Sequence, residues 1–137
     1  MLYSYEIEKT DKGFVGYVED LGFETKPQTS EDDVEFVLTE CLSAFVETMY
    51  RAKGKKIPLP TTSCDGKLAL YVPIKLQLRI LLWNTMKDQC VKQTELAEKL
   101  GVSKAMINQM VNGRGAISSE KYEEVLQVLG KYPKVSI

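Results

Sequence analysis

The sequence contains no histidine among its 137 residues. Histidine is the commonest general base and a frequent metal ligand, so its absence excludes Ser-His and Cys-His catalytic pairs. Cysteine is scarce as well, and Cys41, Cys64 and Cys90 lie far apart without any Cys-x-x-Cys spacing. Three scattered cysteines predict free thiols and argue against a disulfide framework or a zinc site. We therefore expect no bound metal and no cofactor.

Long apolar runs are also missing. No stretch approaches the length that spans a bilayer, and the N-terminal MLYSYEIEKT lacks the charged and apolar regions of a signal peptide. We therefore expect a cytoplasmic protein that makes no membrane contact. The chain does have 44% hydrophobic and 27% charged residues, a balance that is typical of a folded globular protein.

Charge is divided unevenly along the chain. Residues 1–73 hold 8 Lys+Arg and 13 Asp+Glu, a net charge of −5, whereas residues 74–137 hold 10 and 6, a net charge of +4. An acidic half attracts a basic partner, and a basic half is attracted to phosphate backbones. The division predicts two surfaces with different partners, although a chance offset between the halves is the plainer alternative.

The first half has the alternating pattern of β-strands. LYSYEIEK at 2–9 and FVGYVED at 14–20 flank a turn, which predicts an antiparallel hairpin. FETKPQ at 23–28 follows as an edge strand, because its proline cannot donate to a ladder. KLALYV at 67–72 is the last strand of this half.

A single long helix is predicted between these strands. Ser30 with Asp33 three residues later fits a capping pattern at a helix start. Apolar residues then recur at three- and four-residue spacing, which predicts one buried face. The members of that face are Val34, Val37, Leu38, Cys41, Phe45, Val46 and Met49. The result is a small antiparallel sheet with one packed helix.

From Pro73 onward the pattern is helical. Apolar stripes punctuated by glycine predict four helices, at 74–89, 93–100, 103–111 and 119–130. We therefore predict an α+β chain of two domains. An α+β domain occupies 1–73, and an all-α domain occupies 74–137.

The stretch QTELAEKLGVSKAMINQMVNG at 93–113 has the spacing of a helix-turn-helix. Leu96 and Ala97 face inward from its first helix, and Gly101 falls at the turn, where glycine best accepts a left-handed backbone. The outward residues of its second helix are rich in amides, which pair with adenine edges, and include a lysine that can reach guanine. The predicted base-reading residues are Ser103, Lys104, Ala105, Asn108, Gln109 and Asn112. The predicted phosphate contacts are Lys92, Gln93, Arg114 and Lys121.

This stretch resembles the Xre/Cro family of helix-turn-helix domains, in the pattern QxxLAxxLGVSxxxIxxxxxG. The first half resembles the HicB family of antitoxins, through the tyrosine-rich hairpin YSYEIEKTDKGFVGYVEDLGF, the helix, IPLP at 57–60 and YVP at 71–73. That resemblance implies a partial RNase H-like fold for the first domain. The chain departs from the family at 19–24, where EDLGFE lacks the prolines of the usual turn.

The resemblance implies the antitoxin of a type II toxin–antitoxin pair, which masks a HicA-like mRNA-cleaving toxin and represses its own operon at operator DNA. Such a protein acts as a homodimer or as a tetramer made of two dimers, the first domain binding toxin and the second binding DNA. The predicted toxin contacts are Tyr5, Glu6, Glu8, Glu19 and Asp20.

Two alternatives stay open at this point. The chain could be a stand-alone Xre-type transcriptional regulator whose first domain senses a ligand or oligomerises. It could also be a nuclease, because an RNase H-like sheet carrying Glu6, Glu8 and Glu19 could gather carboxylates around Mg²⁺. A two-metal site needs acids from several elements in a shaped cavity. The predicted helix offers acids only at its exposed start, so we expect no enzyme activity.

Overall fold

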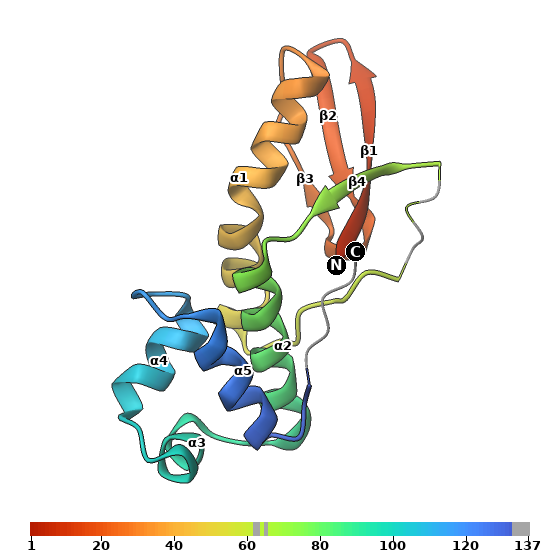
Figure 1. The fold of residues 1–137 in the computed structure, drawn as a ribbon. Coiled ribbons are helices and arrows are strands. Elements are labelled where there is room, and N and C mark those ends of the chain that lie inside the picture. The colour runs from red at the N-terminus through yellow and green to blue at the C-terminus, as the bar shows by residue number, and fades with distance from the viewer. Residues whose placement is uncertain (62–63, 65, 133–137) are drawn as a thin grey trace. The chain divides into compact units, whose positions relative to one another are not determined.

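The computed structural model describes residues 1–61, 64 and 66–132. Within these residues the chain forms four strands and five α-helices, and it divides into two compact units, Met1–Val72 and Pro73–Ile137 (Figure 1). All strands lie in the first unit, and the second unit is helical. The predicted α+β layout, with a helical C-terminal region, is confirmed.

The first unit is an antiparallel sheet covered on one face by a helix (Figure 1). Its strands lie in the order β3-β2-β1-β4. Their bounds are β1 (Leu2–Thr10), β2 (Gly13–Val18), β3 (Phe23–Glu24) and β4 (Leu68–Tyr71). The predicted hairpin is therefore β1–β2, and the predicted edge strand β3 lies at one side of the sheet.

Strand β1 separates two kinds of side chain by simple alternation. Tyr3 and Tyr5 are 0% and 5% exposed and belong to the core under the helix. Glu6 and Glu8 are exposed and lie on the opposite, open face of the sheet. The alternation read from the sequence is therefore confirmed.

The covering helix is α1 (Glu31–Met49). Its start is the predicted one, because the Ser30 hydroxyl accepts the Asp33 N–H at 3.2 Å. The buried residues follow a strict four-residue spacing: Val34, Leu38, Leu42 and Val46. Cys41 and Met49 were predicted on this face, which is wrong: both are exposed, and the spacing gives the place of Cys41 to Leu42.

Gly16 sets how closely α1 approaches the sheet. A Cβ at this position would lie 2.3 Å from Val34 Cγ1 and 3.2 Å from Leu38 Cδ1. The Gly16 N–H donates to the hydroxyl of buried Thr25 at 2.9 Å, which ties β2 to the chain that follows β3. The absence of a side chain at Gly16 is therefore a packing requirement.

The second predicted strand ends earlier than expected. β2 stops at Val18, and Glu19–Leu21 forms a 3₁₀ turn, η1, which closes at Gly22 with a left-handed φ of 65°. Leu21 is 2% exposed, so the turn places it in the core. Glu19 and Asp20 were predicted to continue the strand, which is wrong, because the chain reverses here to form β3.

The second unit packs four helices around one core. They are α2 (Ile74–Gln89), α3 (Gln93–Leu100), α4 (Lys104–Asn112) and α5 (Ser119–Val128). Every one of them contributes to a single buried cluster that includes Leu82, Leu96, Ile107, Met110 and Leu126. In the described part of the chain, no helix combines the length and apolarity needed to cross a membrane.

Candidate functional site

Helices α3 and α4 form a compact pair joined by a tight turn. Leu96 and Ala97 of α3 are 0% and 6% exposed and pack in the core of the unit. Gly101 ends α3 in the left-handed conformation, with φ 65°, as the sequence predicted. The Ser103 hydroxyl then accepts the Met106 N–H at 3.1 Å and caps α4. Helix, turn and helix thus lie where the sequence places them.

The outward face of α4 carries the side chains predicted to read bases. Met110 and Val111 hold the opposite face against the core with no exposure. The outward set consists of exposed Ser103, Lys104, Ala105, Asn108 and Gln109 with half-buried Asn112. This face offers hydrogen-bonding amides and one lysine, which is the chemistry of base-edge recognition in a major groove. Their role as base readers stays a prediction.

Two of these amides, Asn108 and Asn112, are joined by hydrogen bonds to each other and to Gln93 of α3. Asn112 Nδ2 donates to Asn108 Oδ1 at 2.9 Å, one helical turn away. Asn108 Nδ2 donates in turn to Gln93 Oε1 at 3.3 Å, at the start of α3. Gln93, predicted only as a phosphate contact, is therefore also bonded to α4. Asn112 Oδ1 is buried and has no hydrogen-bond partner among the described residues.

Two residues that the sequence did not single out hold the end of α4. Tyr122 Oη of α5 donates to the carbonyl oxygen of Met110 at 2.7 Å in a buried bond. Burial raises the pKa of Tyr122, an effect that the Arg79 charge partly offsets. The Arg79 guanidinium lies directly against Gly113, where a Cβ would stand 1.5 Å from Nη1. In the sequence, the sign of this role was one positively charged residue, Arg79, among the apolar residues of α2.

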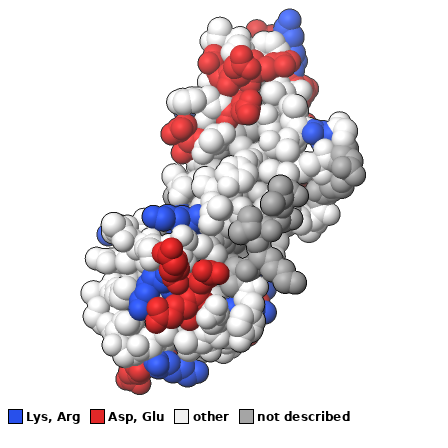
Figure 2. All heavy atoms as spheres, viewed as in Figure 1, with Lys and Arg blue, Asp and Glu red and all other residues white. Residues whose placement is uncertain are grey.

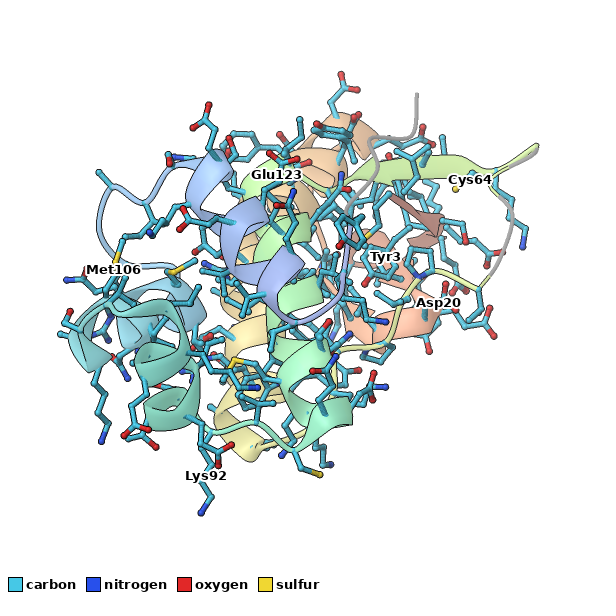
Figure 3. All side chains as sticks on the ribbon, turned by 60° about the horizontal axis from the view of Figure 1, so that its bottom comes forward. Tyr3, Asp20, Cys64, Lys92, Met106 and Glu123 are labelled. Carbon is cyan, nitrogen blue, oxygen red and sulfur yellow. The ribbon has the colours of Figure 1, made fainter. Side chains whose placement is uncertain are left out.

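The predicted phosphate contacts differ in their surroundings. Lys92 and Arg114 are exposed, and Figure 3 shows Lys92 extending away from the ribbon just before α3. Lys121 instead lies 3.3 Å from the Glu124 carboxylate. That ion pair partly neutralises Lys121, so Lys92 and Arg114 are the stronger candidates for phosphate binding. Figure 2 shows acidic and basic groups mixed on the visible face of this unit.

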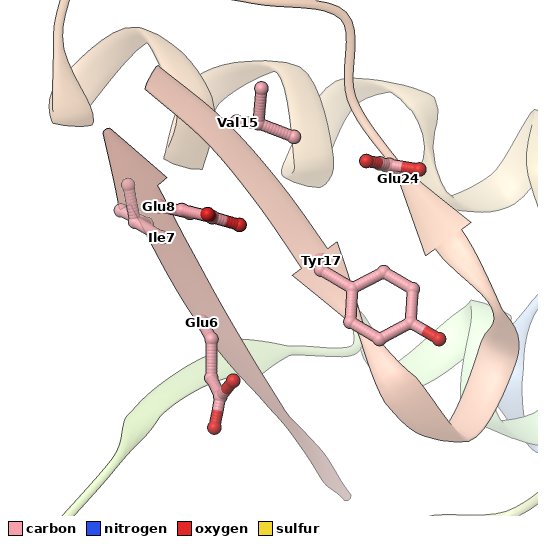
Figure 4. Close-up of a pocket in the computed structure, with 6 residues that line it drawn as sticks. All are labelled: Glu6, Ile7, Glu8, Val15, Tyr17 and Glu24. Carbon is pink, nitrogen blue, oxygen red and sulfur yellow. The ribbon is translucent and has the colours of Figure 1, made fainter. Parts of the chain in front are cut away.

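The open face of the first unit is hollowed and acidic. Glu6, Tyr17 and Glu24 lie opposite one another across β1, β2 and β3, and Glu8 lies opposite Val15. They surround a hollow of about 520 Å³ (Figure 4). The Tyr17 ring, 42% exposed, offers an apolar surface among three carboxylates. Further carboxylates gather around the hairpin turn and the start of α1 (Figure 2).

Of the predicted toxin contacts, the structure brings only Glu6 and Glu8 together. Tyr5 lies under α1 at 5% exposure, so its prediction as a surface contact is wrong. Asp20 accepts the Thr61 N–H at 3.0 Å and the Thr61 hydroxyl at 2.6 Å, which holds the segment before β4. Glu19 is exposed on η1, outside the sheet.

Tyr17 and Glu24 belong to the open face but were not predicted. The strand register could have predicted both, because Glu6 pairs with Tyr17 and Tyr17 pairs with Glu24. Residues paired across antiparallel strands share a face of the sheet. Among the described residues, no three Asp, Glu, Cys or His side chains converge as a metal ion would require.

Comparison with known proteins agrees with this geometry. The family model described as helix-turn-helix (HTH_3) matches residues 91–135. Antitoxin HicB 1 of Photorhabdus laumondii subsp. laumondii is 27% identical over 139 aligned residues, which cover 100% of this chain and 87% of that protein. Antitoxin HicB of Pseudomonas fluorescens (strain Pf0-1) is 31% identical over 73 residues, which cover 53% of this chain and 50% of that protein.

The matches follow the two units. The helix-turn-helix model falls within the second unit and includes both α3 and α4. The similarity to the Photorhabdus protein extends over the sheet unit as well. Together, these matches show that the chain is similar to proteins named Antitoxin HicB and that its residues 91–135 match a helix-turn-helix family.

Proposed function

We propose that the chain is the antitoxin of a type II toxin–antitoxin pair, which masks a HicA-like mRNA-cleaving toxin and represses its own operon. The sheet unit binds the toxin, and the helical unit binds operator DNA as a homodimer. The observation that carries the proposal is the presence, in one chain similar to proteins named Antitoxin HicB, of an acidic open sheet face and an amide-bearing α4 face.

The charge and shape of the open sheet face support the proposed binding of a toxin. An enzyme that cleaves RNA presents basic groups to its substrate, and a negatively charged surface is complementary to such groups. Glu6, Glu8 and Glu24 supply that charge around the hollow. The partly exposed rings of Tyr17 and Tyr71 add apolar area to the unit. Mixed aromatic and charged surfaces of this kind are common at protein interfaces.

The arrangement of α3 and α4 supports the DNA arm. In helix-turn-helix proteins the second helix enters the major groove while the first crosses the backbone. Here α4 presents its amides outward, and Lys92 lies at the start of α3, where it could contact a phosphate. A single small unit makes few contacts, so a two-fold dimer on an inverted operator is expected.

Coexpression tests the toxin arm. The chain is produced with the small open reading frame next to its gene, and copurification and relief of growth arrest are measured. The double variant Glu6→Lys/Glu8→Lys should lose both the complex and the rescue. Glu40→Lys reverses a charge at an exposed position of α1, outside the hollow, and should retain both.

The outcomes separate the proposal from the main alternative. If wild type neither copurifies with the toxin candidate nor restores growth, the antitoxin assignment fails, and a stand-alone Xre-type regulator takes its place. If Glu40→Lys is as damaging as the double variant, the open face is not the binding surface. The DNA arm is tested with a reporter fused to the promoter of the chain's own gene, where wild type should repress and Lys92→Ala should repress less.

A further inference from the structure

The chain that follows α1 is strongly basic, although the unit to which it belongs is acidic. Residues 51–56 carry four of the eight Lys and Arg of residues 1–73, and no Asp or Glu occurs in residues 48–64. Arg51 is half-buried and pairs with the Glu47 carboxylate, one helical turn earlier. The other three cations are exposed, and we call them the basic turn: Lys53, Lys55 and Lys56.

The backbone of the basic turn is held at both ends. The Tyr50 carbonyl oxygen accepts hydrogen bonds from the N–H groups of Lys53 and Lys55, at 3.1 and 2.9 Å. The Tyr50 phenol donates to a carbonyl oxygen of η1 at 2.6 Å, which anchors the start of the turn. Ile57, directly after the turn, is 5% exposed and anchors its end. The three lysines therefore extend from an ordered loop, so little backbone entropy is lost when they bind a partner.

The basic turn lies at the end of the first unit where the chain passes into the second. Tyr3 Oη donates to the Pro58 carbonyl oxygen at 2.5 Å, just after the turn. In the sheet, Tyr3 pairs with Leu70, which lies two residues before Val72, the last residue of the unit. Figure 1 shows the end of α1 and the end of β4 at this same end of the unit. The units meet at the Val72–Pro73 peptide bond, so no linker separates them.

The carboxylates gather at the opposite end of this unit. Helix α1 begins with Glu31, Asp32 and Asp33, and it rises about 28 Å over its 19 residues before the basic turn follows. Figure 2 shows acidic groups around the hairpin turn and the start of α1. The first unit is therefore electrically polarised, with acidic groups far from the junction and lysines next to it.

This polarity fits a unit that is joined directly to a DNA-binding unit. A domain of net charge −5 is repelled by phosphates, and the repulsion is screened only beyond a Debye length of about 8 Å at physiological salt. Lysines at the junction end offer attraction where DNA is nearest, while the carboxylates are kept at a distance. Residues 51–56 contain no amide or aromatic side chain that could read a base, so their contact is with the backbone alone.

We propose that the basic turn is a second DNA contact, which binds the phosphate backbone of the operator beside the segment bound by the helix-turn-helix. The inference rests on the proposed DNA-binding function and adds to it a contact from the sheet unit. It gives the two ends of that unit different partners, a phosphate backbone at the junction end and a basic protein at the acidic face. The alternative is a purely local role, in which the cations stabilise the C-terminal end of α1 through the helix dipole.

The test uses full-length protein and a duplex that wild type enriches from a randomised library with fixed flanks. Affinity is measured at a series of salt concentrations. The variant Lys53→Gln/Lys55→Gln/Lys56→Gln should flatten the slope of log affinity against log salt by about 0.9 for each lost phosphate contact, so by about 2 to 3 in all. Base preference should stay unchanged, because only backbone contacts are removed. Hydroxyl-radical footprinting should show a shorter protected segment than with wild type.

A matched variant separates a local contact from an effect of net charge. Lys9→Gln/Lys12→Gln/Lys26→Gln removes three exposed lysines from the same unit and changes its net charge by the same amount. This control should keep the salt slope and the footprint of wild type. Urea unfolding of both triple variants checks that the fold is retained. Equal flattening of the slope by the two variants would assign the effect to net charge and overturn the proposal.

The possible failures differ from one another. If wild type binds no duplex, the proposed DNA-binding function fails, and this inference fails with it. If wild type binds selectively but the basic-turn variant keeps the salt slope and the footprint, the second contact alone is overturned. The same proteins are also measured against single-stranded RNA. If the basic-turn variant loses affinity for RNA but not for the duplex, the phosphates belong to RNA, and the operator contact is overturned.

Discussion

Tyr122 and Met110 are joined by a buried hydrogen bond of 2.7 Å, in which the phenol of α5 donates to a carbonyl in the last turn of α4. Carbonyl oxygens at the end of a helix lack intrahelical partners. The Arg79 guanidinium, packed on Gly113, places a positive charge beside the same helix end, where the helix dipole favours it. The proposed recognition helix is therefore held at its C-terminal end by α2 and α5.

Tyr122→Phe should lower the free energy of unfolding of the helical unit by about 1 kcal/mol, since it removes one neutral buried hydrogen bond and leaves the Met110 carbonyl with the longer bond, 3.3 Å, from the Gly113 N–H. Urea unfolding followed by circular dichroism measures the change. Tyr132→Phe is the matched control, because Tyr132 is 72% exposed and should lose nothing measurable. Equal losses in the two variants would contradict the role given to Tyr122.

Gly16→Ala should destabilise the sheet unit by about 1–3 kcal/mol, because the added methyl group collides with Val34 of α1. Val34→Ala opens a cavity and should also destabilise it. The double variant Gly16→Ala/Val34→Ala should lose less stability than the sum of the two single losses, because the new methyl group fills part of the space that Val34 vacates. Strictly additive losses in thermal unfolding would show that Gly16 does not set the helix–sheet distance.

Ser103→Ala should cost the helical unit about 1 kcal/mol, the usual worth of an N-cap. Ser118→Ala is the structural counterpart, because the Ser118 hydroxyl caps α5 through the Lys121 N–H at 3.2 Å. Both variants should unfold more easily. Of these two variants, only Ser103→Ala should also weaken DNA binding. A third variant, Ser103→Asp, should restore the helix cap and the stability but weaken DNA binding further, because its carboxylate repels phosphate. Equal DNA affinity in the Ser103 and Ser118 variants would place Ser103 away from the DNA.

The pH dependence of stability should be confined to the extremes of pH. No histidine is present to titrate between about pH 5 and 8, so the free energy of unfolding should stay nearly level there. Burial raises the pKa of Tyr3, Tyr5 and Tyr122 above the ordinary value of a tyrosine. The folded chain therefore holds these protons more tightly than the unfolded chain does.

The stabilisation from these tyrosines is complete below pH about 10, the pKa of a free tyrosine, and is lost as pH rises through the raised values. Unfolding curves at a series of pH values, read together with tyrosinate absorbance, check this expectation. Ionisation of the buried phenols should coincide with unfolding. Ionisation of all seven tyrosines at pH about 10 with the fold intact would rule it out.

The sequence predicted the elements well, because period and capping are local signals. Ser30, Ser103 and Gly101 each stand at a helix end that the structure confirms. The predicted end of β2 was wrong, because burial of Leu21 and the left-handed Gly22 turn the chain before Glu19 can extend it. Whether a strand continues or turns depends on what the next side chain packs against, which a local pattern does not contain.

The sites were harder to predict than the elements. The outward face of α4 follows from helical spacing, but the bond from Asn108 to Gln93 joins residues fifteen positions apart and needs the angle between two helices. Arg79 and Gly113 are similarly distant in sequence. Prediction of the residues around the acidic hollow needs the register across three strands. That register places Glu24 beside Tyr17, whereas Glu19 lies on η1, outside the sheet.

Alternation along β1 has a consequence for how this chain can change over generations. Residues close together in the strand have different roles. Tyr3 and Tyr5 are buried in the core under α1, whereas Glu6 and Glu8 lie on the open face. A substitution at Glu6 or Glu8 can therefore alter the outer surface without touching the core, one position at a time. Insertion of a single residue between Ser4 and Tyr5 would turn the rest of the strand over, burying the Glu6 and Glu8 carboxylates and exposing the Tyr5 phenol. The outward positions of the strand can therefore change in residue type, whereas the length of the strand cannot change.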